Sequence, residues 1–243
     1  MSLRLLCVVA HPDDECFAFG GALALAADRG VETSVICLTD GQAATYRGSA
    51  TSAKELGAMR RAEFAASCKL LGVAHYELLD YQDAQLEFAN LSELAGKLVA
   101  RIRSFRPQVV LTFGSDGALN THPDHTVVSA ATSAAFHWAG SPKRYLELGE
   151  LYQPQRLYHL TTSYFLPDRR PPLPAPWTAT LDISSVFERK QKAFHAHASQ
   201  SPLIERTKPV FEEHRDEERY TLVASPVPQP ARQSTDLFEG VAD

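Results

Sequence analysis

Short apolar runs alternate with longer amphipathic stretches through the first 140 residues. The runs are rich in Val, Ile and Leu, a pattern typical of buried parallel strands, and they cover residues 3–9, 32–39, 75–79 and 108–113. Helical spacing of apolar residues predicts helices over 17–29, 53–71, 90–105 and 126–138. This repeated strand–helix order predicts an α/β fold, with a Rossmann-like, doubly wound, mostly parallel sheet and helices on both faces.

The alternation weakens beyond residue 140. We expect strands at 156–160, 178–183 and 220–224, and a helix at 184–197 with Ser184 as its N-cap. Five prolines between residues 167 and 176 predict an irregular surface excursion, and the Pro/Gln-rich tail is expected to be poorly ordered. The chain therefore divides into a domain over residues 1–200 and a partly irregular C-terminal extension over residues 201–243.

The first apolar run ends in a group of polar residues. Pro12 cannot donate a hydrogen bond to a sheet, so the first strand must stop near His11. The loop that follows carries Asp13, Asp14 and Glu15. In an open parallel sheet, ligands bind outside the carboxyl ends of the strands, and these residues lie at such an end.

The fourth apolar run leads into a second polar group. A Gly-containing loop over 114–117 precedes His122, Pro123, Asp124 and His125, which open the next helix. In a Rossmann-type order, the first and fourth strands are neighbours at the point where the winding reverses. We therefore expect the two groups to meet in one crevice. Either group alone is more simply a turn with a capping carboxylate, whereas both together favour a functional site.

The residue types of the two groups suit a catalytic metal. His11, Asp14 and one of His122 or His125 would make a two-histidine, one-carboxylate site, which leaves room for water. Two imidazoles favour zinc over magnesium, while manganese, iron and nickel stay open as alternatives.

The remaining polar residues would then transfer protons. Asp13 cannot easily point at the same metal as its neighbour Asp14, so it could act as general base on the metal-bound water. The histidine that does not bind metal could protonate a leaving group or stabilise an oxyanion, and Asp124 could keep it charged.

Other polar residues have simpler interpretations. Arg60 lies on a helix whose arginines are by default solvated, and His75 is more readily structural. His195 and His197 are expected at the surface, and the charge run over 212–219 is expected to be a solvated face.

Composition narrows the function classes. The net charge is −5 with Lys and Arg scattered, which disfavours a nucleic-acid partner, and no apolar run approaches the length of a membrane span. The N-terminal run reads as a strand and not as a signal peptide, and the four cysteines lack any Cys-x-x-Cys pairing, which favours a reduced, cytoplasmic protein. Neither a Gly-x-Gly-x-x-Gly nor a Gly-x-Ser-x-Gly motif is present, which argues against a dinucleotide site and a serine hydrolase.

The two polar motifs resemble those of a known family. Residues 10–15 (Ala-His-Pro-Asp-Asp-Glu) and 122–125 (His-Pro-Asp-His) resemble the LmbE-like/PIG-L family of zinc-dependent N-deacetylases. The resemblance covers residues 3–140, with a weaker echo at Lys192 and at 197–200 (His-Ala-Ser-Gln). It implies a Rossmann-like fold and hydrolysis of the N-acetyl group of a glucosamine-containing substrate.

The resemblance also implies a role for each matching residue. The zinc ligands would be His11, Asp14 and His125; Asp13 would be the general base; His122, oriented by Asp124, would be the acid or oxyanion stabiliser; Arg60 and Asp83 would contact the substrate. Two positions depart from the family pattern. The usual Asp-Gly pair reads Asp83-Ala84, and the loop over 117–121 is less rich in glycine.

We therefore expect a zinc-dependent N-deacetylase that acts on an N-acetylglucosaminyl conjugate, a small molecule, and releases acetate. The alternatives are a metal-dependent amide or ester hydrolase with a non-sugar substrate, and a non-catalytic metal-binding module. The module is disfavoured because Asp13 and His122 are both retained, and metal binding alone does not need them. A homo-oligomer stays open, since an exposed sheet edge beyond the fourth or fifth strand could support assembly.

Overall fold

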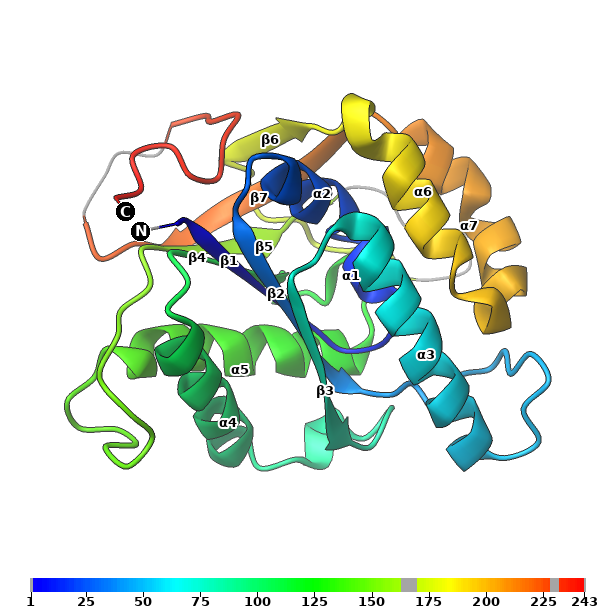
Figure 1. The fold of residues 1–243 in the computed structure, drawn as a ribbon, viewed down its shortest axis with the longest axis horizontal. Helices are drawn as coiled ribbons and strands as arrows, with labels where there is room; N and C mark the ends of the chain where they lie inside the picture. The colour runs from blue at the N-terminus through cyan, green and yellow to red at the C-terminus, as the bar shows by residue number, and fades with distance from the viewer. Residues whose placement is uncertain (1, 163–169, 228–231, 243) are drawn as a thin grey trace.

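A seven-stranded sheet forms the centre of the molecule in a computed structural model that describes residues 2–162, 170–227 and 232–242 (Figure 1). Its strand order is β3-β2-β1-β4-β5-β7-β6. The strands are β1 (Arg4–Val9), β2 (Glu32–Thr39), β3 (His75–Tyr81), β4 (Val109–Phe113), β5 (Arg156–Leu160), β6 (Ala179–Asp182) and β7 (Glu217–Ala224). Strands β1 to β5 pair in parallel, whereas β7 is antiparallel to both its neighbours. The predicted α/β fold with a mostly parallel sheet is confirmed.

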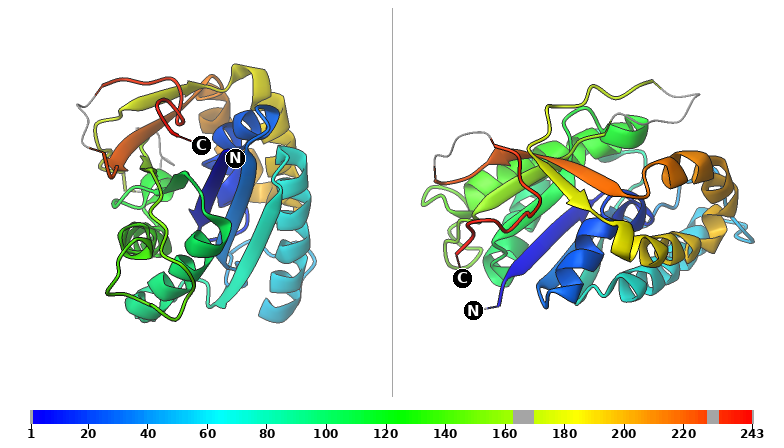
Figure 2. Two further views of the ribbon diagram at one scale, coloured as in Figure 1. Left: turned by 60° about the vertical axis from the view of Figure 1, so that its left-hand side comes forward. Right: turned by 90° about the horizontal axis from the view of Figure 1, so that it is seen from above.

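Helices cover both faces of this sheet (Figure 2). They are α1 (Asp14–Phe17), α2 (Gly20–Asp28), α3 (Ala53–Leu71), α4 (Leu91–Phe105), α5 (Pro123–Ala139), α6 (Phe187–His195) and α7 (Ser201–Glu213). Helices α4 and α5 lie on one face, and α2, α3 and α6 lie on the other, with α7 beside α6. Among the described residues, no helix combines the length and apolar character that crossing a membrane requires.

Strands β1 and β4 form the buried middle of the sheet. Residues 5–9 and 109–113 are fully buried and apolar apart from Thr112, as expected for strands covered on both faces. β1 pairs with β2 on one side and with β4 on the other, so the predicted neighbourhood of the first and fourth strands is confirmed. The winding reverses between them, which opens a crevice at their carboxyl ends.

The helix predicted over 17–29 is present as α2 but begins later, after a gap that separates it from the single turn of α1. α1 ends at Phe17 and α2 starts at Gly20, because α2 begins in tight contact with the C-terminal part of the chain. A Cβ atom on Gly21 would lie 2.3 Å from Ile183 Cγ2, so only glycine fits there. The carboxylate of Glu218 accepts the N–H groups of Gly21 and Ala22 at 2.7 and 2.9 Å and thereby caps α2.

The region after residue 180 differs most from expectation. Ser184 is not the N-cap of α6, because a short 3-10 turn (Ser184–Val186) precedes that helix. The sequence pattern missed α7, which contains Pro209. β7 starts at Glu217, so part of the charge run expected at the surface lies in the sheet, and Glu218 is buried.

The two irregular segments are only partly described. Residues 167–169 of the Pro-rich stretch lie outside the described residues, and residues 170–176 contain neither helix nor strand, as predicted. In the tail, the prediction of poor order is wrong for Leu237 and Phe238, which are buried. Ser234 forms a bridge with Ala179, which holds the tail against β6.

The sheet edges and the cysteines bear on two further expectations. The edge beyond β5 is covered by β7 and β6, so the outermost strands are β3 and β6, and the tail covers part of the β6 edge. The cysteines are buried and unpaired, as expected: Cys7, Cys16, Cys37 and Cys68. A cytoplasmic location and the oligomeric state stay predictions.

Candidate active site and metal centre

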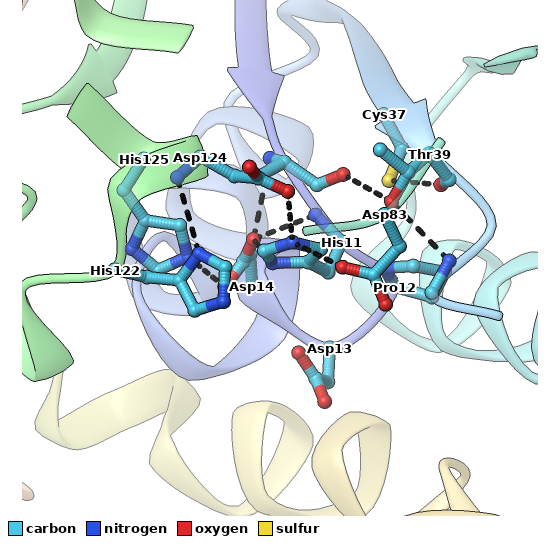
Figure 3. A network of polar contacts seen from close by, with 12 residues as sticks. His11, Pro12, Asp13, Asp14, Cys37, Thr39, Asp83, His122, Asp124 and His125 are labelled. Carbon is cyan, nitrogen blue, oxygen red and sulfur yellow. Dashed lines mark hydrogen bonds and ion pairs between the residues drawn. The ribbon is translucent and has the colours of Figure 1, made fainter. Parts of the chain in front are cut away.

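The predicted metal ligands converge at the carboxyl ends of β1 and β4 (Figure 3). His11, Asp14 and His125 are all buried, and one ligand atom of each lies within 4.8 Å of the others. His11 and Asp14 follow β1, whereas His125 lies in the first turn of α5, which is held by Pro123 at its first position. The parallel pairing of β1 with β4 thus joins two motifs that are more than 100 residues apart.

His125 presents an unpaired nitrogen to this group. Its Nδ1 lies 3.0 Å from the carbonyl oxygen of Gly117, which can only accept, so Nδ1 carries the proton. Nε2 is buried, has no hydrogen-bond partner and faces Asp14 Oδ1 at 3.3 Å. A lone pair and a carboxylate oxygen at this separation repel each other unless a cation or proton lies between them.

His11 is oriented in a complementary way. Its Nε2 lies 3.0 Å from Asp83 Oδ1 and 3.2 Å from Asp124 Oδ2, so these carboxylates hold the protonated nitrogen. Its Nδ1 faces Asp14 Oδ2 at 3.5 Å. Ligand atoms around a tetrahedral zinc are about 3.4 Å apart. The two separations, each to a different oxygen of Asp14, are close to this value, and one ligand atom of each residue lies within 4.8 Å of the others, so the three residues fit a zinc ion.

The electrostatics favour an ionised carboxylate at the centre. Burial would raise the pKa of Asp14, but His125 and His11 outweigh it and lower that pKa well below its usual range. Asp14 Oδ2 also accepts the N–H group of His11 at 2.8 Å. An ionised carboxylate between two imidazoles is a suitable donor set for a divalent metal.

Asp13 is held beside this group but apart from it (Figure 3). Its carboxylate accepts a hydrogen bond from Arg60 at 2.9 Å, and burial raises the pKa of Asp13 to about 6 although Arg60 opposes the rise. Arg60 is only 3% exposed and also donates to the carbonyl oxygens of Pro12 and Gly41. The default expectation that Arg60 is solvated is therefore wrong.

The structure assigns Asp124 a different partner from the one expected. Its carboxylate faces His11 and accepts the N–H groups of Ala84 and Leu86 at 2.8 and 3.2 Å. The hydrogen bond to His122 comes from the backbone N–H of Asp124, which donates to Nδ1 at 3.1 Å. Asp124 thus orients His122 through its backbone, and its carboxylate orients His11.

His122 is neutral in this setting. Burial, together with the neighbouring His11 and His125, lowers the pKa of His122 to about 4. Because Nδ1 accepts a hydrogen bond from the backbone, the neutral ring carries its proton on Nε2. His122 can therefore donate a hydrogen bond to a developing negative charge.

Sequence reasoning missed a buried network behind Asp13. Glu15 is fully buried; its Oε2 accepts the backbone N–H of Asp13 at 2.9 Å, and its Oε1 lies 2.8 Å from His197 Nε2 and accepts the Ser67 hydroxyl. The expectation that His197 is at the surface is therefore wrong, whereas His195 is exposed as predicted. The weak motif over 197–200 was the only sequence signal of this contact.

A polar cavity of about 300 Å³ opens in front of these residues. Its floor includes His11 and Asp13, and the loop after β2 contributes its rim at residues 43–46. Further polar side chains in its walls are Asp14, Arg60, Asp83, Asn120, His122, Gln200 and Arg206. A larger hollow of about 850 Å³ lies between α2, β6 and the tail, but none of the metal-holding groups found among the described residues is there.

Comparisons with known proteins agree with this site. A family model described as "PIG-L: GlcNAc-PI de-N-acetylase" matches residues 6–136, which contain both polar motifs. The chain belongs to the PIG-L family. Its relatives include the mycothiol S-conjugate amidase of Streptomyces coelicolor, at 32% identity over 80% of this chain and 75% of that protein. Another is the 1D-myo-inositol 2-acetamido-2-deoxy-alpha-D-glucopyranoside deacetylase of Rhodococcus erythropolis, at 32% identity over 81% of each chain.

Solved structures show the same fold. The N,N'-diacetylchitobiose deacetylase of Pyrococcus horikoshii matches with a TM-score of 0.74 at 24% identity, over 90% of this chain and 83% of that one. The conserved protein TT1542 of Thermus thermophilus matches with a TM-score of 0.72 at 27% identity, over 96% of this chain and the whole of that one. Membership of the PIG-L family confirms the predicted family and the predicted enzyme class, a deacetylase.

Proposed function

We propose that this PIG-L protein hydrolyses the N-acetyl group of an N-acetylglucosaminyl conjugate, with a zinc ion held by His11, Asp14 and His125. The observation that carries the proposal is the unpaired Nε2 of His125, which faces the Asp14 carboxylate at 3.3 Å, beside an Asp13 carboxylate that Arg60 holds. Two imidazoles and one carboxylate favour zinc among the divalent metals. When bound, the metal supplies Lewis acidity, which polarises the amide carbonyl and makes water a better nucleophile at neutral pH.

Asp13 is proposed as the general base. Its raised pKa of about 6 lets it accept a proton from the attacking water and still return that proton to the leaving amine near neutral pH. Arg60 holds the carboxylate in place through its 2.9 Å hydrogen bond. Arg60 therefore acts first as a positioning residue, and its contact with substrate stays a prediction.

His122 is proposed to stabilise the oxyanion. A neutral imidazole with its proton on Nε2 donates a hydrogen bond without losing that proton, which suits a developing alkoxide better than a general acid role. The backbone N–H of Asp124 fixes this tautomer. Asp83 holds His11 and accepts the N–H group of Ala43, which lies in the rim of the cavity. Asp83 would therefore both fix this rim and bind a sugar hydroxyl.

The substrate class is inferred from the cavity and the relatives. The 300 Å³ cavity offers polar groups for a sugar, and relatives with 31–32% identity are named as deacetylases of a glucosamine derivative. The relative named an amidase favours a second candidate, cleavage of a bulkier amide at the same site. A screen of acetylated amino sugars against simple amides would separate the two.

The first test measures bound metal and acetate release from N-acetylglucosamine conjugates, with and without a chelator. Chelation is expected to abolish release. Asp13→Ala should keep its zinc and lose roughly 10²–10⁴-fold in kcat, whereas His11→Ala should lose both. Asp80→Ala, which removes an exposed carboxylate, is the matched control and should be fully active. Loss of zinc in Asp13→Ala would contradict the assignment of Asp13 as base.

A further inference from the structure

A second, apolar cavity of about 70 Å³ borders the metal-holding group. Asp14 and His125 line one end of it, and the rest is formed mainly by hydrocarbon. Its apolar walls are Phe17, Leu119, Phe194, Leu203 and Val210. These side chains come from α1, the loop before α5, α6 and α7, so the part of the chain beyond residue 190 completes the cavity.

The far wall of this cavity is built from packed aromatic rings. Phe17 packs against Phe194 and Phe211 with ring centroids 5.0 and 5.4 Å apart, and Phe194 stacks on Phe211 at 5.3 Å. Thr207 also lines the cavity, but its hydroxyl donates to the carbonyl oxygen of Leu203 at 2.9 Å. The wall therefore offers methyl and ring surfaces and little for a polar group to bond.

The two cavities meet at the proposed reaction centre. Four residues line both of them: Asp13, Asp14, Asn120 and Leu203. The carbonyl carbon of an amide bears two substituents that point in different directions, the nitrogen and the acyl carbon. The sugar on the nitrogen needs hydrogen-bond partners and fits the polar cavity, so the acyl carbon points toward the apolar one.

We propose that the apolar cavity is an acyl-chain subsite that admits propionyl and butyryl groups as well as acetyl. This inference rests on the proposed amide hydrolysis. An apolar cavity of about 150 Å³ accommodates the six carbons of benzene. A cavity of about 70 Å³ therefore has room for about three carbons beyond the carbonyl. Acetyl would fill only part of it.

The extended reaction is the same hydrolysis with a longer acyl group. Water forms the new carbon–oxygen bond, the carbon–nitrogen bond breaks, and the products are a short-chain carboxylate and the free amine, which keeps the transferred proton. Leu119, in the loop before α5, helps to set which acyl groups fit the subsite. It stands in the stretch that departs from the glycine-rich family pattern, and it forms part of the subsite wall.

The deciding experiment measures binding of the product carboxylates to the zinc-loaded protein by calorimetry. Affinity should rise about fourfold for each methylene from acetate through propionate to butyrate, and hexanoate should gain nothing over butyrate. Equal affinities for acetate and butyrate, or weaker binding of butyrate, would overturn the subsite. This readout does not require turnover.

Two opposite changes at Val210, half-buried on α7, test the location. Val210→Phe should fill the cavity and lower the butyrate-to-acetate affinity ratio by about tenfold. Val210→Ala should enlarge it, so that hexanoate binds more tightly than butyrate. Val223→Phe, at an exposed valine on β7, is the matched control and should keep the wild-type ratio. Misfolding cannot produce shifts of opposite sign, and unchanged ratios in both Val210 variants would refute the assignment.

Hydrolysis of N-acetyl and N-butyryl glucosamine separates this inference from the function on which it rests. The subsite predicts kcat/KM for the butyryl compound at least equal to that for the acetyl compound. Chain-length-dependent carboxylate binding without hydrolysis of either sugar would contradict the proposed function and support the subsite. Hydrolysis of the acetyl compound alone, with flat carboxylate binding, would support the function and overturn the subsite.

Discussion

Asp13 is the residue at which backbone strain and chemistry coincide. Its φ of +111° lies in the left-handed region, which costs a residue with a side chain about 1–2 kcal/mol. Glu15 accepts its N–H, and Arg60 contacts both its carboxylate and the preceding carbonyl. These buried contacts hold the carboxylate beside the metal ligands without letting it join them.

Removing the charge of Glu15 should therefore impair catalysis, because Glu15 holds the backbone N–H of Asp13. Glu15 and His197 form a fully buried pair, so Glu15→Gln is expected to lower the free energy of unfolding by about 3 kcal/mol. We expect kcat to fall more than KM changes, with zinc content retained, because a neutral amide oxygen holds the backbone N–H of Asp13 more weakly than a carboxylate does. Denaturant unfolding and steady-state kinetics check both effects.

The same pair allows a double-mutant cycle. Glu15→Gln combined with His197→Gln should cost less stability than the sum of the single changes, because neither partner is then left charged alone. Glu87→Gln removes an exposed glutamate and should change neither stability nor kcat. Additive losses in the cycle would mean that the two residues do not act as a pair.

Ala84 occupies a position that suits glycine. Its φ is +61°, and its N–H donates to Asp124 at 2.8 Å, so the backbone cannot relax without breaking a contact of the active site. The departure from the family's Asp-Gly pair is thus a local strain next to Asp83.

Ala84→Gly is expected to stabilise the protein by about 1 kcal/mol, because glycine adopts positive φ without a steric penalty. Ala89→Gly, five residues on at a φ of −72°, should instead destabilise it by about 0.5–1 kcal/mol. Urea unfolding of the two variants measures both effects. A loss of stability in Ala84→Gly would show that the strain is not relieved there.

At the scale of elements, the sequence predicted best where local signals agree. α3 is capped by Ser52 and ends at Gly72, and α4 is capped by Asn90, so their bounds followed from the pattern. α7 was missed because Pro209 lies inside it, and packing on α6 overrides that local signal. The break between α1 and α2 depends on Glu218 and Ile183, which no local pattern reveals.

A prediction at this scale concerns His159 on β5. Burial lowers the pKa of His159 to about 4, and its Nε2 shares a hydrogen bond with the Ser133 hydroxyl on α5. An unfolded histidine has a pKa near 6.5. Between these values the unfolded chain binds the proton more readily, so this contribution to stability is complete above about pH 6.5 and is lost as pH falls toward 4.

The unfolding free energy of the wild type falls as pH is lowered from 6.5 to 4. His159→Gln should reduce the slope of this fall by up to about 1.4 kcal/mol per pH unit. His137→Gln, at an exposed histidine on α5, should leave the slope unchanged. Urea unfolding at several pH values measures the slopes. Parallel curves for His159→Gln and wild type would refute the contribution.

At the scale of the molecule, the sequence located the site but not its full support. The motifs at 10–15 and 122–125 lie at the tips of adjacent strands, so topology alone brings them together. The sequence does not show which groups the Asp124 carboxylate contacts, because its partners, the N–H groups of Ala84 and Leu86, come from the loop between β3 and α4. His197 reaches Glu15 across 182 residues, a contact that only the folded C-terminal part creates.

The C-terminal part should consequently be needed for folding. β7 lies inside the sheet between β5 and β6, and Glu218 on it pairs with Lys190 at 2.7 Å and caps α2. A chain ending at residue 200 would leave Lys190 buried without its partner and expose the edge of β5. We expect this chain to lack a cooperative unfolding transition by circular dichroism.

A chain ending at residue 226 is the control, because it keeps β7 and loses the buried Leu237 and Phe238. Burial of these two side chains contributes about 3 kcal/mol or more, so the control should fold cooperatively with a lower unfolding free energy and retain zinc. If the chain ending at 200 folded and bound zinc as well as this control, residues 1–200 would be an independent domain. If only the chain ending at 200 failed to fold, β7 and α7 would belong to the catalytic domain. α7 also completes the proposed acyl subsite.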